Sequence, residues 1–167
     1  MTLQADIAIE CESWSSLKNL DQLVNEALQA ALTEAEVTLL DGAEVSLLFC
    51  DDARIREINH EWRGFDKPTN VLSFPAVSYD RLETAPLIGD IAIAYETVLR
   101  EAKDEDKSLH DHTSHMIVHG MLHLLGFDHE TDDEAEEMED LERAALARLN
   151  IADPYSETEP LKGKIKS

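Results

Sequence analysis

The sequence predicts an α+β fold: a single domain in which a small mixed sheet is packed by about five helices. Short strand-like stretches alternate with segments of helical periodicity, and one longer segment between them shows no periodicity. A chain of 167 residues has the length of one domain with its own core. We therefore expect one domain over residues 1–152, followed by a polar, flexible tail over residues 153–167.

The first half of the chain begins with a strand, predicted over residues 5–11 from alternating apolar side chains. Apolar residues at helical spacing then predict a helix over residues 17–33, and a second strand follows over residues 44–50. Asp51 is a favoured residue type at a helix N-terminus, so it predicts a short helix that runs to about Glu61.

The middle of the chain predicts two further strands around a loop. Residues 70–74 are expected to form a short strand that Pro75 stops, because proline lacks the N–H group that a sheet needs. Residues 76–86 are expected to form a loop. A strand over residues 89–95 comes next and leads into a helix that ends near Asp104.

Two capping patterns predict the last two helices. Ser108 and Asp111 have the spacing of a capping box, and so do Thr131 and Glu134. The second of these helices ends before Asp153-Pro154. Its sequence is densely acidic up to Glu142, which predicts a solvated helix face.

Composition limits the classes of partner. The net charge of −22 repels nucleic acid on average, although arginines and lysines gather in the middle of the chain and at its end. No apolar run approaches the roughly 20 residues of a membrane-spanning helix, and the N-terminus lacks a signal-peptide pattern, so we expect a cytoplasmic protein with no membrane partner. Cys11 and Cys50 are expected to be free, buried thiols.

The most informative motif spans residues 119–129. His119 and His123 are four residues apart, so a helix places them on one face. Gly126 can end that helix in a left-handed conformation, and the chain then turns back so that His129 reaches the same ion. Three imidazoles and an open fourth position are typical of a catalytic Zn²⁺ site, which predicts a metallohydrolase-like domain with one Zn²⁺ ion.

Two other interpretations of the histidines stay open. The motif can be a histidine-rich helix face without metal, or it can hold a structural ion with Asp128 as a fourth ligand. One turn before His119, His115 is a candidate for orienting a ligand or carrying a proton. His110 and His112 are expected to be half-exposed.

The spacing of the three histidines is also that of the metzincin peptidases. Those enzymes use a glutamate directly after the first histidine as general base, but this chain has Gly120 at that position. Without the base, water activation and protonation of the leaving amine fail. The chemistry therefore disfavours a peptidase.

Arg63 is the candidate anion-binding residue. It lies at the end of a predicted helix, between an aromatic residue and a glycine, where its guanidinium can offer two parallel donors to a phosphate. The alternative is a surface ion pair between Arg63 and either Glu61 or Asp66.

Together these segments resemble the bacterial YbeY family. The resemblance rests on His-Gly-x-Leu-His-Leu-x-Gly-x-Asp-His at 119–129, Asn-x-x-x-Arg-x-x-Asp-x-x-Thr-x-Val-Leu-Ser-Phe at 59–74, and Gly89-Asp90-Ile91, and it covers about residues 5–150. It implies a zinc-dependent endoribonuclease that prefers single strands and acts in 16S ribosomal RNA maturation and ribosome quality control. By the same resemblance, the zinc ligands are His119, His123 and His129, and Arg63 is functionally important.

The resemblance also suggests partners: single-stranded ribosomal RNA, the small ribosomal subunit and a ribosomal protein. In the implied reaction, Arg63 stabilises charge on the phosphate, and His115 or Asp90 carries a proton. Phe65 and Trp62 are candidates for stacking on unpaired bases, although Trp62 is expected in the core. The competing functions are a ribosome assembly factor without catalysis and a metallopeptidase.

Overall fold

The computed structural model describes residues 3–155 and confirms the α+β prediction. Four strands form one sheet in the order β1-β2-β4-β3. Their bounds are β1 (Leu3–Ile9), β2 (Ala43–Cys50), β3 (Val71–Pro75) and β4 (Leu87–Ala94). The first three in this order run parallel, while β3 is antiparallel to β4, with Val71 opposite Ile93 and Pro75 opposite Gly89.

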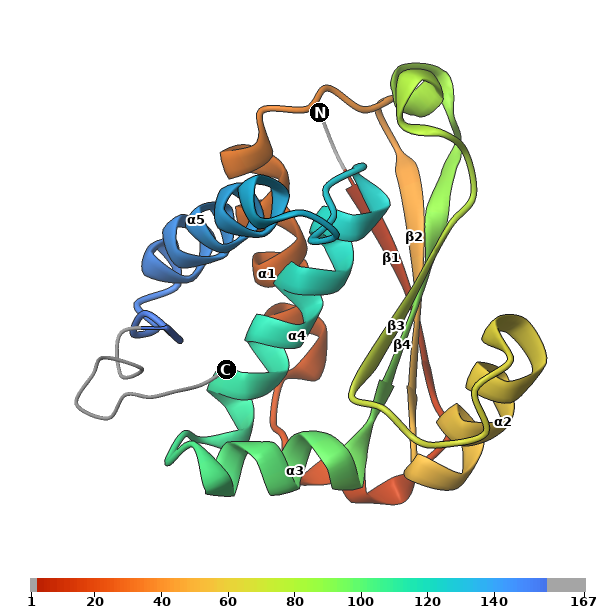
Figure 1. Cartoon of the computed structure of the whole chain (residues 1–167), viewed down its shortest axis with the longest axis vertical. Helices are drawn as coiled ribbons and strands as arrows, with labels where there is room; N and C mark the ends of the chain where they lie inside the picture. Colours follow the sequence, from red (N-terminus) through yellow and green to blue (C-terminus); the bar gives the residue numbers. More distant parts are fainter. Residues whose placement is uncertain (1–2, 156–167) are drawn as a thin grey trace.

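The described residues form five α-helices and two 3₁₀ helices. These are η1 (Glu12–Ser16), α1 (Leu20–Ala35), α2 (Asp52–Arg63), η2 (Tyr79–Thr84), α3 (Tyr95–Asp104), α4 (Leu109–Leu124) and α5 (Asp132–Arg148). Helices α1, α4 and α5 lie on one side of the sheet and α2 on the other (Figure 1). None of the helices between residues 3 and 155 is long and apolar enough to cross a bilayer.

The main core lies between the sheet and the three-helix side. Inward residues of β2, such as Val45 and Phe49, alternate with less buried ones and pack against that side. A smaller apolar cluster on the opposite sheet face includes Leu72 and Ile55 of α2. Both cysteines are free, as predicted; Cys50 is buried, whereas Cys11 is only half-buried.

Several element boundaries differ from the sequence prediction. The first strand ends at Ile9 because the chain turns into η1, where Trp14 is fully buried and its Nε1–H donates to the Cys50 carbonyl at 2.9 Å. Helix α1 consequently begins at Leu20 instead of residue 17. The expected loop over 76–86 contains η2, which Leu82 anchors in the core.

The two predicted caps are present. The Ser108 hydroxyl accepts from the Asp111 amide at the start of α4, and Thr131 and Glu134 form a complete capping box at the start of α5. Helix α5 ends at Arg148, and Tyr155 returns to contact it. The remainder of the predicted tail, residues 156–167, lies outside the described residues.

Gly120 allows α4 to lie close against β3 and β4. A Cβ atom at this position would stand 3.1 Å from both the Ser73 Oγ and the Ile91 Cγ2. The Ser73 hydroxyl also donates to the Gly120 carbonyl at 3.2 Å. Position 120 therefore faces the sheet, and a long side chain there would be forced between the helix and the strands.

Gly120→Glu, which restores the residue of the metzincin motif, should lower the free energy of unfolding by more than about 3 kcal/mol, because it adds volume and a charge to a packed interface. Urea denaturation measures this. Ala53→Glu, at an exposed position in the first turn of α2, is the control and should stay within about 0.5 kcal/mol of the unmodified chain. A stable Gly120→Glu protein would contradict the packing argument.

Candidate metal centre

Three histidine rings converge where α4 ends and the chain turns back. His119 and His123 lie on the last turns of α4, and His129 lies in the loop before α5. The three candidate ligand nitrogens all lie within 4.8 Å of one another. The structure therefore confirms that His119 and His123 share one face of a helix and that the following loop brings His129 back to them.

Gly126 produces the turn that brings His129 back. It adopts a φ of +103°, a left-handed conformation that favours glycine. The Gly126 amide donates to the His123 carbonyl and the Phe127 amide to the Leu122 carbonyl, each at 3.0 Å, which is the Schellman ending of a helix. The predicted role of Gly126 is thus present in detail.

The donor set fits a divalent transition metal. The Nε2 atoms of His119 and His123 are 3.2 Å apart, close to the separation of about 3.3 Å that two ligands have at tetrahedral zinc. Burial, together with the neighbouring His119 and His129 rings, lowers the pKa of His123 to about 4. His123 is therefore neutral near pH 7, the form that binds a metal.

No carboxylate or thiolate among residues 3–155 joins this cluster as a fourth ligand. Asp128, the candidate for that role, accepts a hydrogen bond from the His129 amide at 2.8 Å instead. Asp128 also lines the cleft around the three histidines. An ion held by these three histidines would therefore keep one ligand position for water or substrate, which is typical of a catalytic site.

Glu142 of α5 is a residue that the sequence prediction missed. Its carboxylate is 1% exposed and lies 2.6 Å from the His119 Nδ1 and 2.8 Å from the His115 Nε2. Burial alone would raise the pKa of Glu142, but the hydrogen bonds from the two histidines outweigh burial and hold that pKa well below its usual range. The sequence predicted a solvated acidic face up to Glu142, but Glu142 itself is a buried carboxylate.

The sequence did contain a signal for Glu142. Apolar side chains recur at helical spacing at Met138 and Ala145 of α5 and at Leu149 directly after it, and Glu142 takes the place of an apolar residue on that same stripe. A charged residue on a buried stripe is a candidate for a structural or functional partner. What the sequence does not give is which partner it meets.

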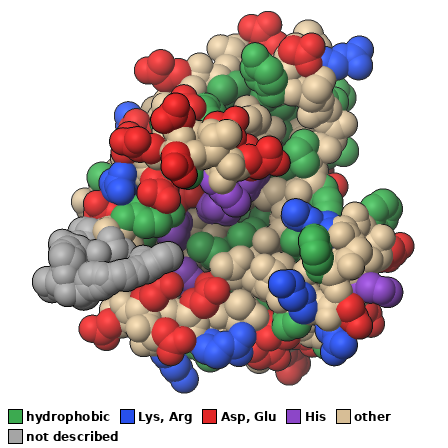
Figure 2. All heavy atoms as spheres, viewed as in Figure 1, with side chains coloured by type: hydrophobic (Ala, Val, Ile, Leu, Met, Phe, Trp, Pro, Cys, Tyr) green, Lys and Arg blue, Asp and Glu red, His purple; other side chains and the backbone are tan. Residues whose placement is uncertain are grey.

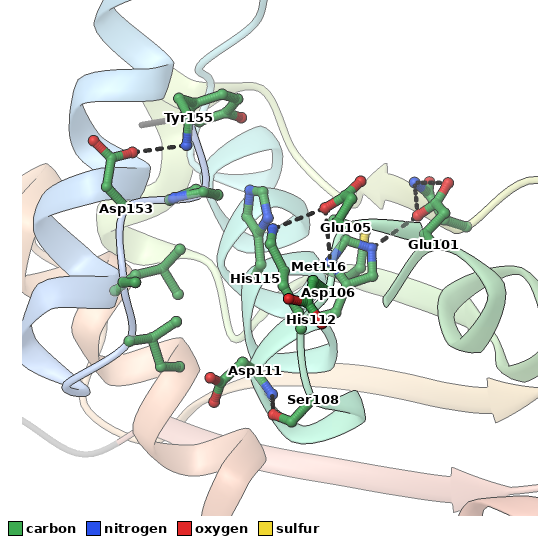
Figure 3. A pocket seen from close by; sticks show the side chains of 16 residues that line it. Glu101, Glu105, Asp106, Ser108, Asp111, His112, His115, Met116, Asp153 and Tyr155 are labelled. Atoms are coloured by element: carbon green, nitrogen blue, oxygen red, sulfur yellow. Dashed lines mark hydrogen bonds and ion pairs between the residues drawn. The ribbon is translucent and has the colours of Figure 1, made fainter. Parts of the chain in front are cut away.

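The histidines before His119 lie beside a second pocket. His115 and His112 are both buried and line a cavity of about 640 Å³ between α4 and the segment that follows α5 (Figure 3). His115 reaches Glu142, while His112 lies 2.8 Å from Glu101 of α3. The expectation that His112 is half-exposed is wrong, because α3 covers it.

Arg63 lines the metal cleft. This cleft has a volume of about 730 Å³ and is bounded by the three histidines, by β3 and by the segment after α2. Asp66, one expected partner of Arg63, pairs with Arg56 at 2.7 Å. Among residues 3–155 the Arg63 guanidinium makes no ion pair or hydrogen bond, so it is available to a ligand.

The charges around the cleft are divided between its sides. Figure 2 shows histidine side chains in a hollow, with acidic side chains gathered over α5 and Lys and Arg side chains across the hollow. Lys67 and Phe65 line the same cleft as Arg63, and the Lys67 ammonium lies 5.8 Å from the centre of the Phe65 ring. One wall thus combines cations with an exposed aromatic ring.

Two sequence candidates lie elsewhere. Trp62 is 68% exposed, so the prediction of a core position is wrong, and it borders a groove on the opposite face of the sheet. Asp90 lines that same groove because its strand directs it away from α4. Neither residue lines the metal cleft, and Asp90 is therefore not placed to carry a proton there.

A family model and a solved structure both match this chain. The family model described as "Endoribonuclease YbeY" matches residues 7–150. A solution structure of a protein from Thermotoga maritima superposes with a TM-score of 0.54 and 22% identity, and the match covers 96% of this chain and all of the other, which supports the fold.

Curated relatives carry the same family name. "Endoribonuclease YbeY" of Beijerinckia indica is 56% identical over 93% of this chain and 78% of its own length. The protein of that name from Agrobacterium fabrum is 49% identical over 95% of this chain and 98% of its own length. With the family model matching residues 7–150 and relatives of this identity, the chain belongs to the YbeY family.

Proposed function

We propose that this protein is a zinc-dependent endoribonuclease that cleaves single-stranded ribosomal RNA during 16S rRNA maturation and ribosome quality control. The observation that carries the proposal is the guanidinium of Arg63, which has no partner among the described residues, in the same cleft as three converging histidines. The printed name of its relatives, endoribonuclease, supports the reaction class.

The three histidines would hold one Zn²⁺ ion through neutral imidazole nitrogens. When bound, this ion supplies Lewis-acid chemistry: it polarises a phosphoryl oxygen and makes water more acidic. The chain's own contribution is to fix the ligands on α4 and its turn, and to leave one position facing the cleft.

Arg63 would bind the phosphate at which the chain is cut. A guanidinium keeps its charge at any physiological pH, and its paired donors match two phosphate oxygens. The negative charge on these oxygens grows in the transition state, so a fixed cation beside them lowers the barrier. Lys67 on the same wall would hold a neighbouring phosphate.

The shape and charge of the cleft favour a single strand. Phe65 is 53% exposed beside the cations, so an unpaired base can stack on its ring while its phosphate contacts the wall. The strongly acidic remainder of the chain repels RNA, which suggests that a basic ribosomal protein of the small subunit delivers the substrate in the cytoplasm.

Replacing a histidine of the triad should remove metal and activity together. We expect His119→Ala or His123→Ala to lower bound zinc from one equivalent to a trace, because two imidazoles do not complete a zinc site. Metal analysis and RNA cleavage by the same preparations test this. His110→Ala, at an exposed position on the first turn of α4, should keep both.

Replacing Arg63 should separate binding of metal from catalysis. We expect Arg63→Ala to lower kcat/KM for single-stranded RNA by at least about 100-fold, since it removes the cation beside the phosphate, while one zinc stays bound. Arg56→Ala, which breaks only the surface pair with Asp66, is the matched control. Equal cleavage by Arg63→Ala and the unmodified protein would indicate a contaminating ribonuclease and favour a non-catalytic assembly factor.

The two exposed aromatic residues should differ in their effect on RNA binding. We expect Phe65→Ala to weaken binding of a single-stranded oligonucleotide by about 5- to 100-fold, the loss of one stacked base. Trp62→Ala should leave this affinity within about two-fold, because Trp62 borders the groove on the other face of the sheet. Fluorescence anisotropy measures both, and the reverse order would place the RNA on that other face.

A further inference from the structure

We propose that Glu142 is a positioning residue that holds His119 in the tautomer and orientation that a metal requires. The proposal rests on the proposed function, because it assumes that His119 binds the ion. The observation that carries it concerns the two ring nitrogens of His119. One of them contacts the buried carboxylate of Glu142, and the other faces His123.

The first step concerns the ring of His119. Its Nδ1 lies 2.6 Å from the Glu142 Oε2, and its Nε2 lies 3.2 Å from the Nε2 of His123. A carboxylate only accepts hydrogen bonds, so the proton of neutral His119 belongs on Nδ1. The lone pair of Nε2 then points toward His123, where an ion would be shared.

The second step concerns what holds Glu142 itself. Its Oε1 accepts from the His115 Nε2 at 2.8 Å and from the Tyr155 hydroxyl. The carboxylate is therefore fixed by three donors, two from α4 and one from the segment after α5. A carboxylate fixed in this way cannot rotate away from His119, and its charge increases the basicity of that ring toward an ion.

This assigns a role to His115 that differs from carrying a proton in the cleft. His115 does not line the metal cleft, and it reaches the ligand His119 only through Glu142. Its Nδ1 is buried without a hydrogen-bond partner among the described residues, so its single proton is on Nε2 and is donated to the carboxylate. The Nε2 proton of His115 thus helps to fix Glu142.

The chain offers a matched control on the same helix. Glu101 and His112 form a second pair of histidine and carboxylate, in which His112 is buried and Glu101 is half-buried, with the His112 Nε2 2.8 Å from the Glu101 Oε1. Glu101 also accepts from the Asn70 amide at 3.1 Å, so it is held by two donors. This pair does not touch His119, His123 or His129, so its loss should affect packing but not the ion.

The test compares Glu142→Gln with Glu101→Gln. We expect Glu142→Gln to raise the Zn²⁺ dissociation constant by about 10- to 100-fold, measured by competition with a chromophoric chelator, whereas Glu101→Gln stays within about two-fold. Thermal unfolding of the metal-free proteins establishes that both variants fold. An unchanged constant in a folded Glu142→Gln protein, or an equal loss in both variants, would overturn the proposal.

A second measurement needs neither metal nor a folded variant. Nitrogen-15 NMR of the metal-free, unmodified chain reports which ring nitrogen of His119 carries the proton, and we expect Nδ1. A proton on Nε2 would overturn the proposal even if zinc binds. If the unmodified chain bound zinc with His119 protonated on Nδ1 but the pure protein cleaved no RNA, the proposed nuclease function would fail and the orienting role of Glu142 would stand.

Discussion

The packing of α4 is the constraint on which the metal centre depends. This helix is buried over most of its surface, between the sheet on one side and α1 and α5 on the other (Figure 1). At Gly120 it lies so close to β3 and β4 that even a methyl group would meet Ser73 and Ile91 at 3.1 Å. Because the helix cannot rotate or slide in such a core, His119 and His123 have fixed directions, and only His129 depends on a loop.

Electrostatics at the site are local and do not follow the net charge of −22. The buried charge of Glu142 is held by hydrogen bonds from His115 and His119, and the exposed charges of Arg63 and Lys67 line the cleft. Exposed charges further away are screened over roughly 8 Å in physiological salt. An anionic ligand in the cleft therefore senses the cations beside it more strongly than the acidic surface of α5.

The sequence predicted what depends on short spacing and missed what depends on distant packing. The histidine triad and the left-handed Gly126 follow from an eleven-residue segment whose local geometry is almost fully determined. The partner of His119 could not be predicted in this way, since Glu142 lies 23 residues away on another helix. The predictions for His112 and Trp62 are wrong for the same reason. Helix α3 covers His112 and buries it, whereas Trp62 borders an open groove on the sheet and stays exposed.

The same packing also gives a geometric argument against a peptidase. The sequence alone shows only that the glutamate of the peptidase motif is missing at position 120. In a metzincin-like motif the position after the first histidine must present a carboxylate to the water that attacks the substrate. Here that position faces β3 and β4, and the Gly120 carbonyl accepts from Ser73 of the sheet. The carboxylate that does approach the triad, Glu142, contacts the far side of His119 and is 1% exposed, so it cannot reach a substrate in the cleft. The position that supplies the general base in metzincins therefore cannot supply one here, whereas a cleft lined by the triad and by Arg63, which has no ion-pair partner among the described residues, suits a phosphodiester.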